Sequence, residues 1–419
     1  MYRKTTLDNG IRVVTEHIPH VYSISLGIWV KTGSRDEKKE ENGISHFIEH
    51  MLFKGTKQRS ALDIAREIDA VGGVLNASTS REFTNFYAKV LDKDLTLAID
   101  LLSDIFLNST FLAKELERER GVIFQEIKMV EDTPDEYVQD LFNQHFFSGN
   151  PLGSPILGNY RTISRITKPE LIEFFQKYYL RPFRIIVSVA GRLNHNVVVE
   201  NINQTLGQII PQAENRTLDT PEPISGIHIF SKDLEQVHLC MGTKGISQTN
   251  PFRYAVYVLN VLLGGSMSSR LFQEIREKRG LAYAVFSYTS SYSDTGMLNV
   301  YAGTTRNKVK KVVDLIVREL KKFKANPLKK KELEKAKEQL KGNILLSYEN
   351  TDVRMSRLAK GELYFGKFIP MKEILTGIEK VSVDDIQQLA GELFQNKYFS
   401  LAALGKIEEK DLSPELLAL

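Results

Sequence analysis

The chain has 419 residues, of which 42% are hydrophobic and 26% charged, a composition typical of a globular chain long enough for two or three domains. Its net charge of +4 is weak over this length, so neither nucleic acid nor an acidic membrane surface is indicated as a partner. The single cysteine, Cys240, excludes an internal disulfide and a cysteine-ligated zinc site, and it favours a reducing compartment.

The N-terminal segment carries no targeting signal that we can identify. Residues 1–10 lack the apolar core of a signal peptide, and no apolar run in the chain is long enough to span a membrane. Asn9-Gly10 predicts a two-residue hairpin turn that leads into a strand over 11–15. We therefore expect the mature fold to begin at residue 1 and the protein to be cytoplasmic, in a bacterium.

The first half of the chain mixes strand and helix patterns. Residues 23–31 alternate as a strand and carry the only tryptophan, Trp29, which is expected to pack in the core. The remaining patterns predict helices over 61–71, 95–107, 114–130, 136–145 and 169–179, and strands over 74–80, 84–90 and 184–190.

The most informative stretch is His46-Phe47-Ile48-Glu49-His50, inside a helix predicted from 44 to 54. Ser45 is expected to cap this helix, and Gly55 to end it. At about 100° per residue, both histidines lie on one face with Glu49 beside them, so one metal ion could bind both imidazoles next to a carboxylate base. A helix with two surface histidines is the alternative, and a third ligand would decide, because catalytic zinc takes three protein ligands and a water.

A candidate third ligand lies in the charged helix over 114–130. Glu119 and Glu126 are seven residues apart and share one face of that helix, whereas Glu115 and Glu117 fit a solvated role. For any single glutamate in such a helix, exposure to solvent is the ordinary alternative.

This combination of motifs resembles the pitrilysin/insulinase family of zinc peptidases, especially its two-domain members of mitochondrial-processing-peptidase type. The resemblance extends over nearly the whole chain. It implies that zinc is the cofactor, that His46, His50 and Glu126 are its ligands, that Glu49 is the general base, and that Glu119 is a second carboxylate supporting the site.

The second half repeats the order of the first. Residues 211–226 hold three prolines and few apolar residues, which predicts a linker over 213–226 between a catalytic domain, 1–212, and a second domain, 227–419. Residues 84–88 resemble residues 298–302, and a predicted helix follows each of these two segments. The predicted fold class is therefore α+β, with two duplicated domains that each have a mixed, mainly antiparallel sheet covered by helices.

The metal motif is not repeated. The two Lys-Glu-Leu-Glu segments, 114–117 and 331–334, align Glu119 with Ala336 and Glu126 with Asn343. The second half also lacks a histidine pair at helical spacing. Only the first half is predicted to hold a metal.

Two further stretches gain roles from the resemblance. In the family, an arginine and a tyrosine seven residues apart hold the substrate carbonyl oxygen, and Arg276 and Tyr283 match them, with Arg270 and Arg279 as close alternatives. The strand over 74–79 resembles the edge to which an extended peptide adds, with Asn76 and Ala77 lining the cleft. The pattern of that strand alone fits an ordinary core strand equally well. In the second half, the pair Gly264-Gly265 is not a phosphate loop, because the Gly-Lys-Ser/Thr ending is missing.

Solvated or packing roles are expected for residues 353–363, the run Lys329-Lys330-Lys331 and the other histidines. These histidines are His17, His20, His145, His195, His228 and His238.

The resemblance implies an endopeptidase that cleaves unfolded peptides or presequences. Two such chains would face each other as a clamshell homodimer, in which Arg276 and Tyr283 act in trans. Two other functions stay open: a non-catalytic structural or partner subunit, like the respiratory-complex core proteins that are similar to this family, and a metal-binding module without peptidase activity.

Overall fold

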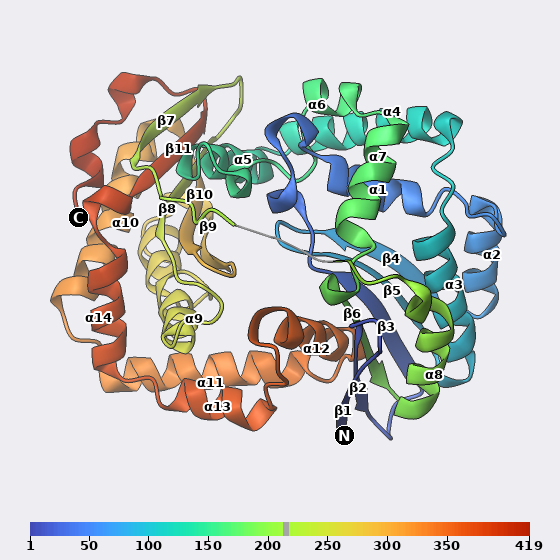
Figure 1. Ribbon diagram of the computed structural model, residues 1–419. Coiled ribbons are helices and arrows are strands. Elements are labelled where there is room, and N and C mark those ends of the chain that lie inside the picture. Colours follow the sequence, from blue (N-terminus) through green and yellow to red (C-terminus); the bar gives the residue numbers. More distant parts are fainter. Residues whose placement is uncertain (213–217) are drawn as a thin grey trace. The chain divides into compact units, whose positions relative to one another are not determined.

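The computed structural model describes residues 1–212 and 218–419, which form two compact units (Figure 1). Unit 1 comprises Met1–Lys128, Ser154–Thr217 and Leu346–Phe368. Unit 2 comprises Met129–Gly153, Leu218–Leu345 and Ile369–Leu419.

Unit 1 is built on a six-stranded sheet with the order β1-β2-β6-β3-β5-β4. Only β2 and β6 are parallel neighbours, so the sheet is mixed and mainly antiparallel. The strands are β1 (Tyr2–Thr6), β2 (Arg12–His17), β3 (Ser23–Val30), β4 (Val74–Thr79), β5 (Thr84–Leu91) and β6 (Ile185–Gly191).

Helices of the first half of the sequence cover one face of this sheet, and fully buried aromatic side chains such as Phe47, Phe86 and Phe106 fill the space between them. The helices are α1 (Ile44–Leu52), α2 (Ala61–Ala70), α3 (Leu95–Asn108), α4 (Ala113–Glu131), α6 (Tyr160–Arg165), α7 (Lys168–Phe174) and α8 (His195–Thr205). The predicted helices are confirmed, but α6 and α8 were not predicted. Helix α6 is short, and α8 is rich in β-branched and asparagine residues that favour helix weakly.

Unit 2 has a five-stranded sheet with the order β7-β11-β8-β10-β9, in which only β7 and β11 are parallel. The strands are β7 (Gly226–Ser231), β8 (Val237–Lys244), β9 (Ala282–Ser291), β10 (Gly296–Thr304) and β11 (Ser400–Gly405). Its helices are α5 (Pro134–Phe146), α9 (Arg253–Leu263), a short π-helix η8 (Phe272–Glu277), α10 (Val309–Ala325), α11 (Lys330–Ser347), α13 (Met371–Glu379) and α14 (Val383–Leu393).

The two sheets share both strand order and register. Strands β2-β6-β3-β5-β4 correspond to β7-β11-β8-β10-β9, with the same directions throughout. The sequence repeat aligns Asn85 with Asn299. Asn85 lies opposite Trp29 of β3, and Asn299 lies opposite Gly242 of β8. The predicted fold class, two duplicated α+β copies, is confirmed.

The two halves of the sequence exchange one helix each. Figure 1 shows α12 (Thr351–Phe365), from the second half, against β2, β3 and β6 of unit 1, where Met355 and Leu358 pack with Trp29. Helix α5, from the first half, packs on β8 and β11 of unit 2, where Phe142 and Cys240 share one apolar cluster. The compact units therefore differ from the ranges 1–212 and 227–419 by these two segments.

Polar contacts fix α12 on the unit 1 sheet. The hydroxyl of Ser25 donates to the carboxylate of Asp352 at 2.5 Å, and the ammonium of Lys4 lies 2.7 Å from the carboxylate of Glu362. The Glu362 side chain is only 1% exposed, whereas that of Lys4 is 32% exposed, so the carboxylate of this pair is buried and its partner reaches solvent. The packing role expected for residues 353–363 is confirmed.

The N-terminal hairpin differs from its prediction in the turn. The amide of Gly10 donates to the carbonyl of Leu7, and Gly10 has a φ of +99°. The loop thus contains three residues and ends in a left-handed glycine, whereas a two-residue turn was predicted. The predicted linker falls partly outside the described residues, and 218–225 contain no helix or strand.

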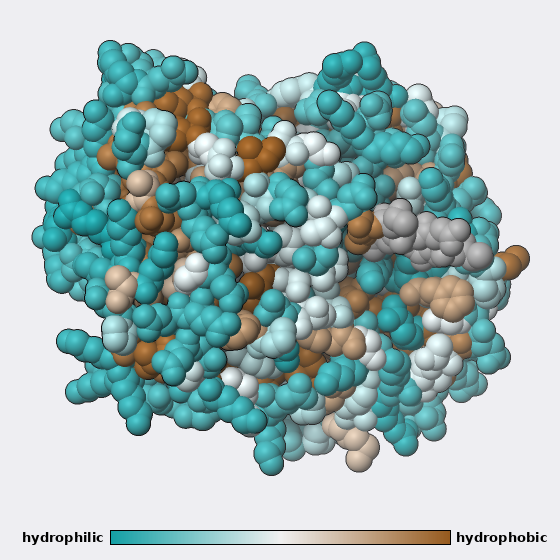
Figure 2. Space-filling view, turned by 60° about the vertical axis from the view of Figure 1, so that its left-hand side comes forward, coloured by the Kyte–Doolittle hydropathy of each residue, from teal (hydrophilic) through white to brown (hydrophobic). Residues whose placement is uncertain are grey.

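Figure 2 shows a face on which hydrophilic side chains predominate and hydrophobic ones gather in several patches between them. Among the described residues, no helix combines the length and the apolar composition that crossing a bilayer requires. The cytoplasmic location stays a prediction.

Candidate metal centre

Helix α1 is short, and its position is determined by burial. Phe47, Ile48 and Met51 are completely buried against the unit 1 core, which turns His46 and His50 to the opposite side. Nine residues make too few backbone hydrogen bonds for a stable isolated helix, so packing has to supply the remaining stability.

The start of α1 is held by Glu37, a residue that the sequence analysis missed. Gly43 precedes the helix with a φ of +95°, and its amide donates to one carboxylate oxygen of Glu37 at 2.8 Å. The amide of Ser45 donates to the other oxygen at 2.9 Å. The prediction that Ser45 caps the helix is wrong, because Ser45 lies inside the first turn. Burial raises the pKa of Glu37 to about 7, against the lowering effect of these hydrogen bonds.

Two buried ion pairs anchor the loop that carries Glu37. The guanidinium of Arg35 lies 2.8 Å from the carboxylate of Glu82, and both side chains are at most 6% exposed. Arg184 lies 3.3 Å from Asp36 in the same way. No periodic pattern marks these contacts in the sequence, because the partners come from distant segments.

Three metal-ligating atoms converge between α1 and α4. The Nε2 atoms of His46 and His50 each lie 3.5 Å from the same carboxylate oxygen of Glu126. Zinc bonds of about 2.0–2.1 Å in a tetrahedral site place neighbouring ligand atoms roughly 3.3 Å apart, so this arrangement fits zinc. Within residues 1–212 and 218–419, these three residues are the group of His, Cys, Asp and Glu side chains close enough to hold a metal.

The protonation states of two of these groups suit a metal. Burial and the neighbouring His50 lower the pKa of His46 to about 4, so its imidazole is neutral near pH 7. A hydrogen bond with His50 lowers the pKa of Glu126, which keeps it a carboxylate. For His50, burial opposes the charge, but contacts with Glu126 and Glu119 outweigh it and raise its pKa. A metal has to displace that proton.

Glu119 lies behind His50. One carboxylate oxygen lies 3.1 Å from Nδ1 of His50, and the other lies 2.8 Å from the ammonium of Lys54. A proton on Nδ1 that donates to Glu119 leaves the Nε2 lone pair facing Glu126, which fixes tautomer and ring orientation. These contacts suit Glu119 to a positioning role, which stays a prediction. Lys54, which balances its charge, was not identified from the sequence. By contrast, the buried Nδ1 of His46 has no hydrogen-bond partner among the described residues.

Glu49 is held by the edge strand β4. The hydroxyl of Thr79, the last residue of β4, donates to the Glu49 carboxylate at 2.5 Å. Asn76 and Ala77 lie in the same strand, whose side chains are all exposed or half-buried. Strand β4 lies at the edge of the sheet, with Ala77 packed against the core, and the role of Asn76 and Ala77 in binding a peptide stays a prediction.

Arg276 and Tyr283 meet each other in unit 2. The Arg276 guanidinium lies 4.9 Å from the centre of the Tyr283 ring, on the edge strand β9. The alternatives are occupied elsewhere: Arg270 makes two hydrogen bonds to Glu332, and Arg279 pairs with Glu274. These contacts favour Arg276 over both.

Comparison with known proteins decides the family. Residues 12–159 match the family described as Insulinase (Peptidase family M16), and residues 165–340 match the one described as Peptidase M16 inactive domain. The protein named uncharacterized zinc protease YmxG from Bacillus subtilis is 42% identical over 398 residues, covering 95% of this chain and 97% of that protein. The chain belongs to peptidase family M16.

A second relative and a solved structure are also similar to this chain. The uncharacterized zinc protease SCO5738 from Streptomyces coelicolor is 40% identical, covering 98% of this chain and 91% of that protein. The crystal structure of a protease from Helicobacter pylori shares the fold, with a TM-score of 0.89, 24% identity and coverage of 97% and 99%. The resemblance inferred from the motifs is confirmed, and the names of these relatives agree with the predicted zinc cofactor.

Glu119→Gln tests the role assigned to Glu119 in this M16 protein. Glutamine leaves an amide nitrogen where His50 or Lys54 needs an acceptor, so zinc affinity is expected to fall by about 10- to 100-fold. Competition with a chromophoric chelator measures it. Glu117→Gln is the control, because Glu117 lies in the same helix with its side chain 70% exposed. Equal affinities of the two variants would contradict the assignment.

Glu37→Gln tests the electrostatics of the helix start. The pKa of Glu37 is about 7 in the folded protein against an ordinary value of 4.5, so folding favours its protonated form. The stability of the native chain relative to this variant is therefore greatest below pH 4.5 and falls, by up to ~3 kcal/mol, as the pH rises to about 7. Thermal unfolding of both proteins across this range measures the difference. If the stability of the native chain relative to the variant rises with pH instead, the amides of Gly43 and Ser45 lower the pKa of Glu37 by more than burial raises it.

Proposed function

We propose that this M16 protein is a zinc-dependent endopeptidase that hydrolyses unstructured peptides. The proposal rests on one observation: His46, His50 and Glu126 place three ligand atoms within 4.8 Å of one another, with Glu49 next in the chain to His50. When bound, zinc would polarise a water molecule and the scissile carbonyl.

Glu49 is the proposed general base. Its carboxylate takes the proton of the attacking water and later delivers it to the leaving amine. Burial raises the pKa of Glu49, although the hydrogen bond from Thr79 opposes the shift. A base whose pKa moves toward the working pH accepts and returns a proton more readily than an ordinary carboxylate.

The free edge of β4 is the proposed substrate platform. An extended peptide can add to an unpaired strand edge through main-chain hydrogen bonds, and its side chains would pass Asn76 and Ala77. Because β4 ends at Thr79, which bonds to Glu49, a peptide on this edge is led to the base. Folded proteins seldom offer a free extended segment, so unfolded peptides and presequences are the substrates that fit.

Arg276 and Tyr283 are the proposed donors to the oxyanion. They contact each other, and Tyr283 is 78% exposed, which leaves its hydroxyl accessible to a substrate. We place them in trans, on the second chain of a clamshell homodimer. A non-catalytic partner subunit would not need Glu49 beside an intact ligand set, so this alternative is less well supported.

Two substitutions separate catalysis from metal binding. Glu49→Gln removes the base but no ligand, so it should keep zinc while cleavage of unstructured peptides falls by about 10²- to 10⁴-fold. Glu126→Gln should lose both zinc and cleavage. Zinc content per chain and hydrolysis of a mixed peptide set measure the two effects. Zinc retained by Glu126→Gln, or activity retained by Glu49→Gln, would overturn the mechanism.

Mixing two inactive variants tests action in trans. Glu126→Gln lacks the metal site, and Arg276→Ala lacks the donor, so each homodimer is inactive. In an equimolar mixture that exchanges subunits, half of the dimers are mixed and carry one complete site, which restores about a quarter of the native activity. If Arg276 acts in cis, the mixture stays inactive. Light scattering checks that both variants are dimers.

A further inference from the structure

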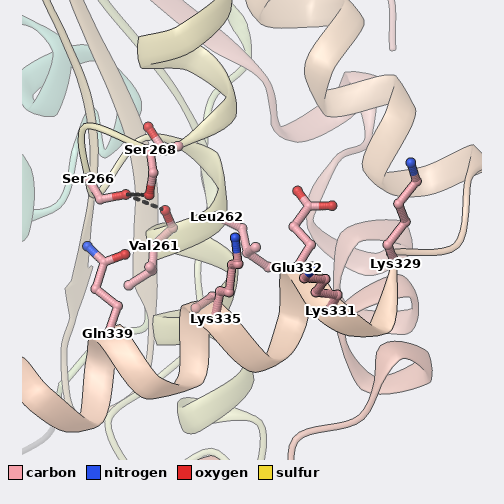
Figure 3. Close-up of a pocket in the computed structure, with 11 residues that line it drawn as sticks. Val261, Leu262, Ser266, Ser268, Lys329, Lys331, Glu332, Lys335 and Gln339 are labelled. Atoms are coloured by element: carbon pink, nitrogen blue, oxygen red, sulfur yellow. Dashed lines mark hydrogen bonds between the residues drawn. The ribbon is translucent and has the colours of Figure 1, made fainter.

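Unit 2 contains a cavity of about 360 Å³ between the end of α9, the loop that follows it and the first half of α11 (Figure 3). Lysines and serines dominate its polar lining. The lining residues are Val261, Leu262, Ser266, Ser268, Ser269, Lys329, Lys331, Glu332, Lys335, Ala336 and Gln339.

The duplication explains why there is space here. Ser78 and Tyr288 lie opposite the equivalent Asn85 and Asn299 in the two sheets. Ser78 and Tyr288 therefore occupy equivalent positions, 210 residues apart in the chain. The same offset of 210 residues aligns Gly55 with Gly265.

That alignment places Gly264 opposite Lys54, and the Lys-Glu-Leu-Glu repeat places Ala336 opposite Glu119. Unit 1 fills this position with the Lys54–Glu119 ion pair. In unit 2, Ala336 lines the cavity at the position where unit 1 has the Glu119 carboxylate. Gly264 is closely packed instead, because a Cβ at this position would lie 2.5 Å from the amide nitrogen of Ser287.

The charges on α11 do not cancel at this cavity. Its glutamates are paired with other cations: Glu332 with Arg270, Glu334 with Lys337 and Glu338 with Lys341. The ammonium groups of Lys329, Lys331 and Lys335 have no carboxylate partner in the part of the chain that the structure describes. Lys329 and Lys331 belong to the run for which a solvated role was expected, and all three lysines are exposed. They also line one cavity, where their combined charge attracts an anion.

Hydroxyl donors face the same space. The hydroxyls of Ser266 and Ser268 are hydrogen-bonded to each other at 3.3 Å, and that of Ser266 also donates to the carbonyl of Val261 at 3.5 Å. Figure 3 shows Lys335 and Gln339 extending from α11 toward this loop. Ser269 is only 2% exposed, and its hydroxyl has no hydrogen-bond partner among the described residues. A buried hydroxyl without a partner is costly, so a ligand that supplies an acceptor would stabilise it.

We propose that this cavity binds a small molecule through a phosphate group. Lysine ammonium groups act as point charges for phosphate, and serine hydroxyls donate to its oxygens. The volume is at the lower end of the range for small-molecule sites, which suits a compact phosphorylated compound. The site differs from a phosphate loop, because its charges come from α11 and from Lys329 just before it instead of a Gly-Lys-Ser/Thr ending. It does not depend on peptidase activity.

Calorimetric titration of the full, zinc-loaded chain tests the site, with orthophosphate, pyrophosphate and AMP as separate ligands. We expect Lys331→Gln/Lys335→Gln to weaken binding at least about tenfold, because two charged contacts are removed. Lys310→Gln/Lys311→Gln is the control, since it removes the same charge from exposed positions on α10. Both double variants keep the zinc ligands, so phosphate bound at zinc contributes equally to each.

A second variant guards against misfolding of the first. Ser268→Asp places a carboxylate among the lining hydroxyls at an exposed position, and it should abolish binding while the thermal midpoint stays near the native value. Tighter binding of AMP than of orthophosphate would identify a nucleotide as the source of the phosphate, and equal binding a free phosphate. No binding by the native chain, or binding that survives in both cavity variants, would overturn the proposal.

Discussion

The candidate centre depends on one carboxylate oxygen that two imidazoles share. Glu126 lies 3.5 Å from both histidines, yet α1 and α4 are separate in the sequence, and only packing and polar contacts hold them together. Metal ligands tolerate errors of only a few tenths of an ångström. Three features therefore help to fix the distance between the Glu126 oxygen and the two histidines. They are the apolar face of α1, the hydrogen bonds from its first turn to Glu37 and the Lys54–Glu119 ion pair.

The sequence identified those residues whose spacing reflects a regular element. His46 and His50 follow from helical periodicity, as do Glu119 and Glu126. Glu37 and Thr79 could not be found in this way, because each acts across the fold on a distant segment without a periodic signature. For the same reason, solvated or packing roles were expected for residues 353–363, but the sheet on which α12 packs was not predicted.

The two copies show what each position requires. The sheet order and register are retained in both, so the strands are under the constraint of folding. The helix positions beside the candidate metal ligands of the first copy have changed in the second, where Ala336 replaces the buried carboxylate of Glu119. Side chains that serve chemistry have diverged within an architecture that did not change, which separates the residues that fold the domain from those that use it.

The exchanged helices bear on how the chain can be divided. Without α12, a fragment ending before the linker would leave Trp29 of β3 and its apolar neighbours on β2 and β6 uncovered. Without α5, the complementary fragment would expose the apolar side chains of β8 and β11. The gene halves are thus recognisable repeats but not autonomous folding modules, and a chain nicked between residues 212 and 218 would remain associated through the helix that each fragment contributes to the other.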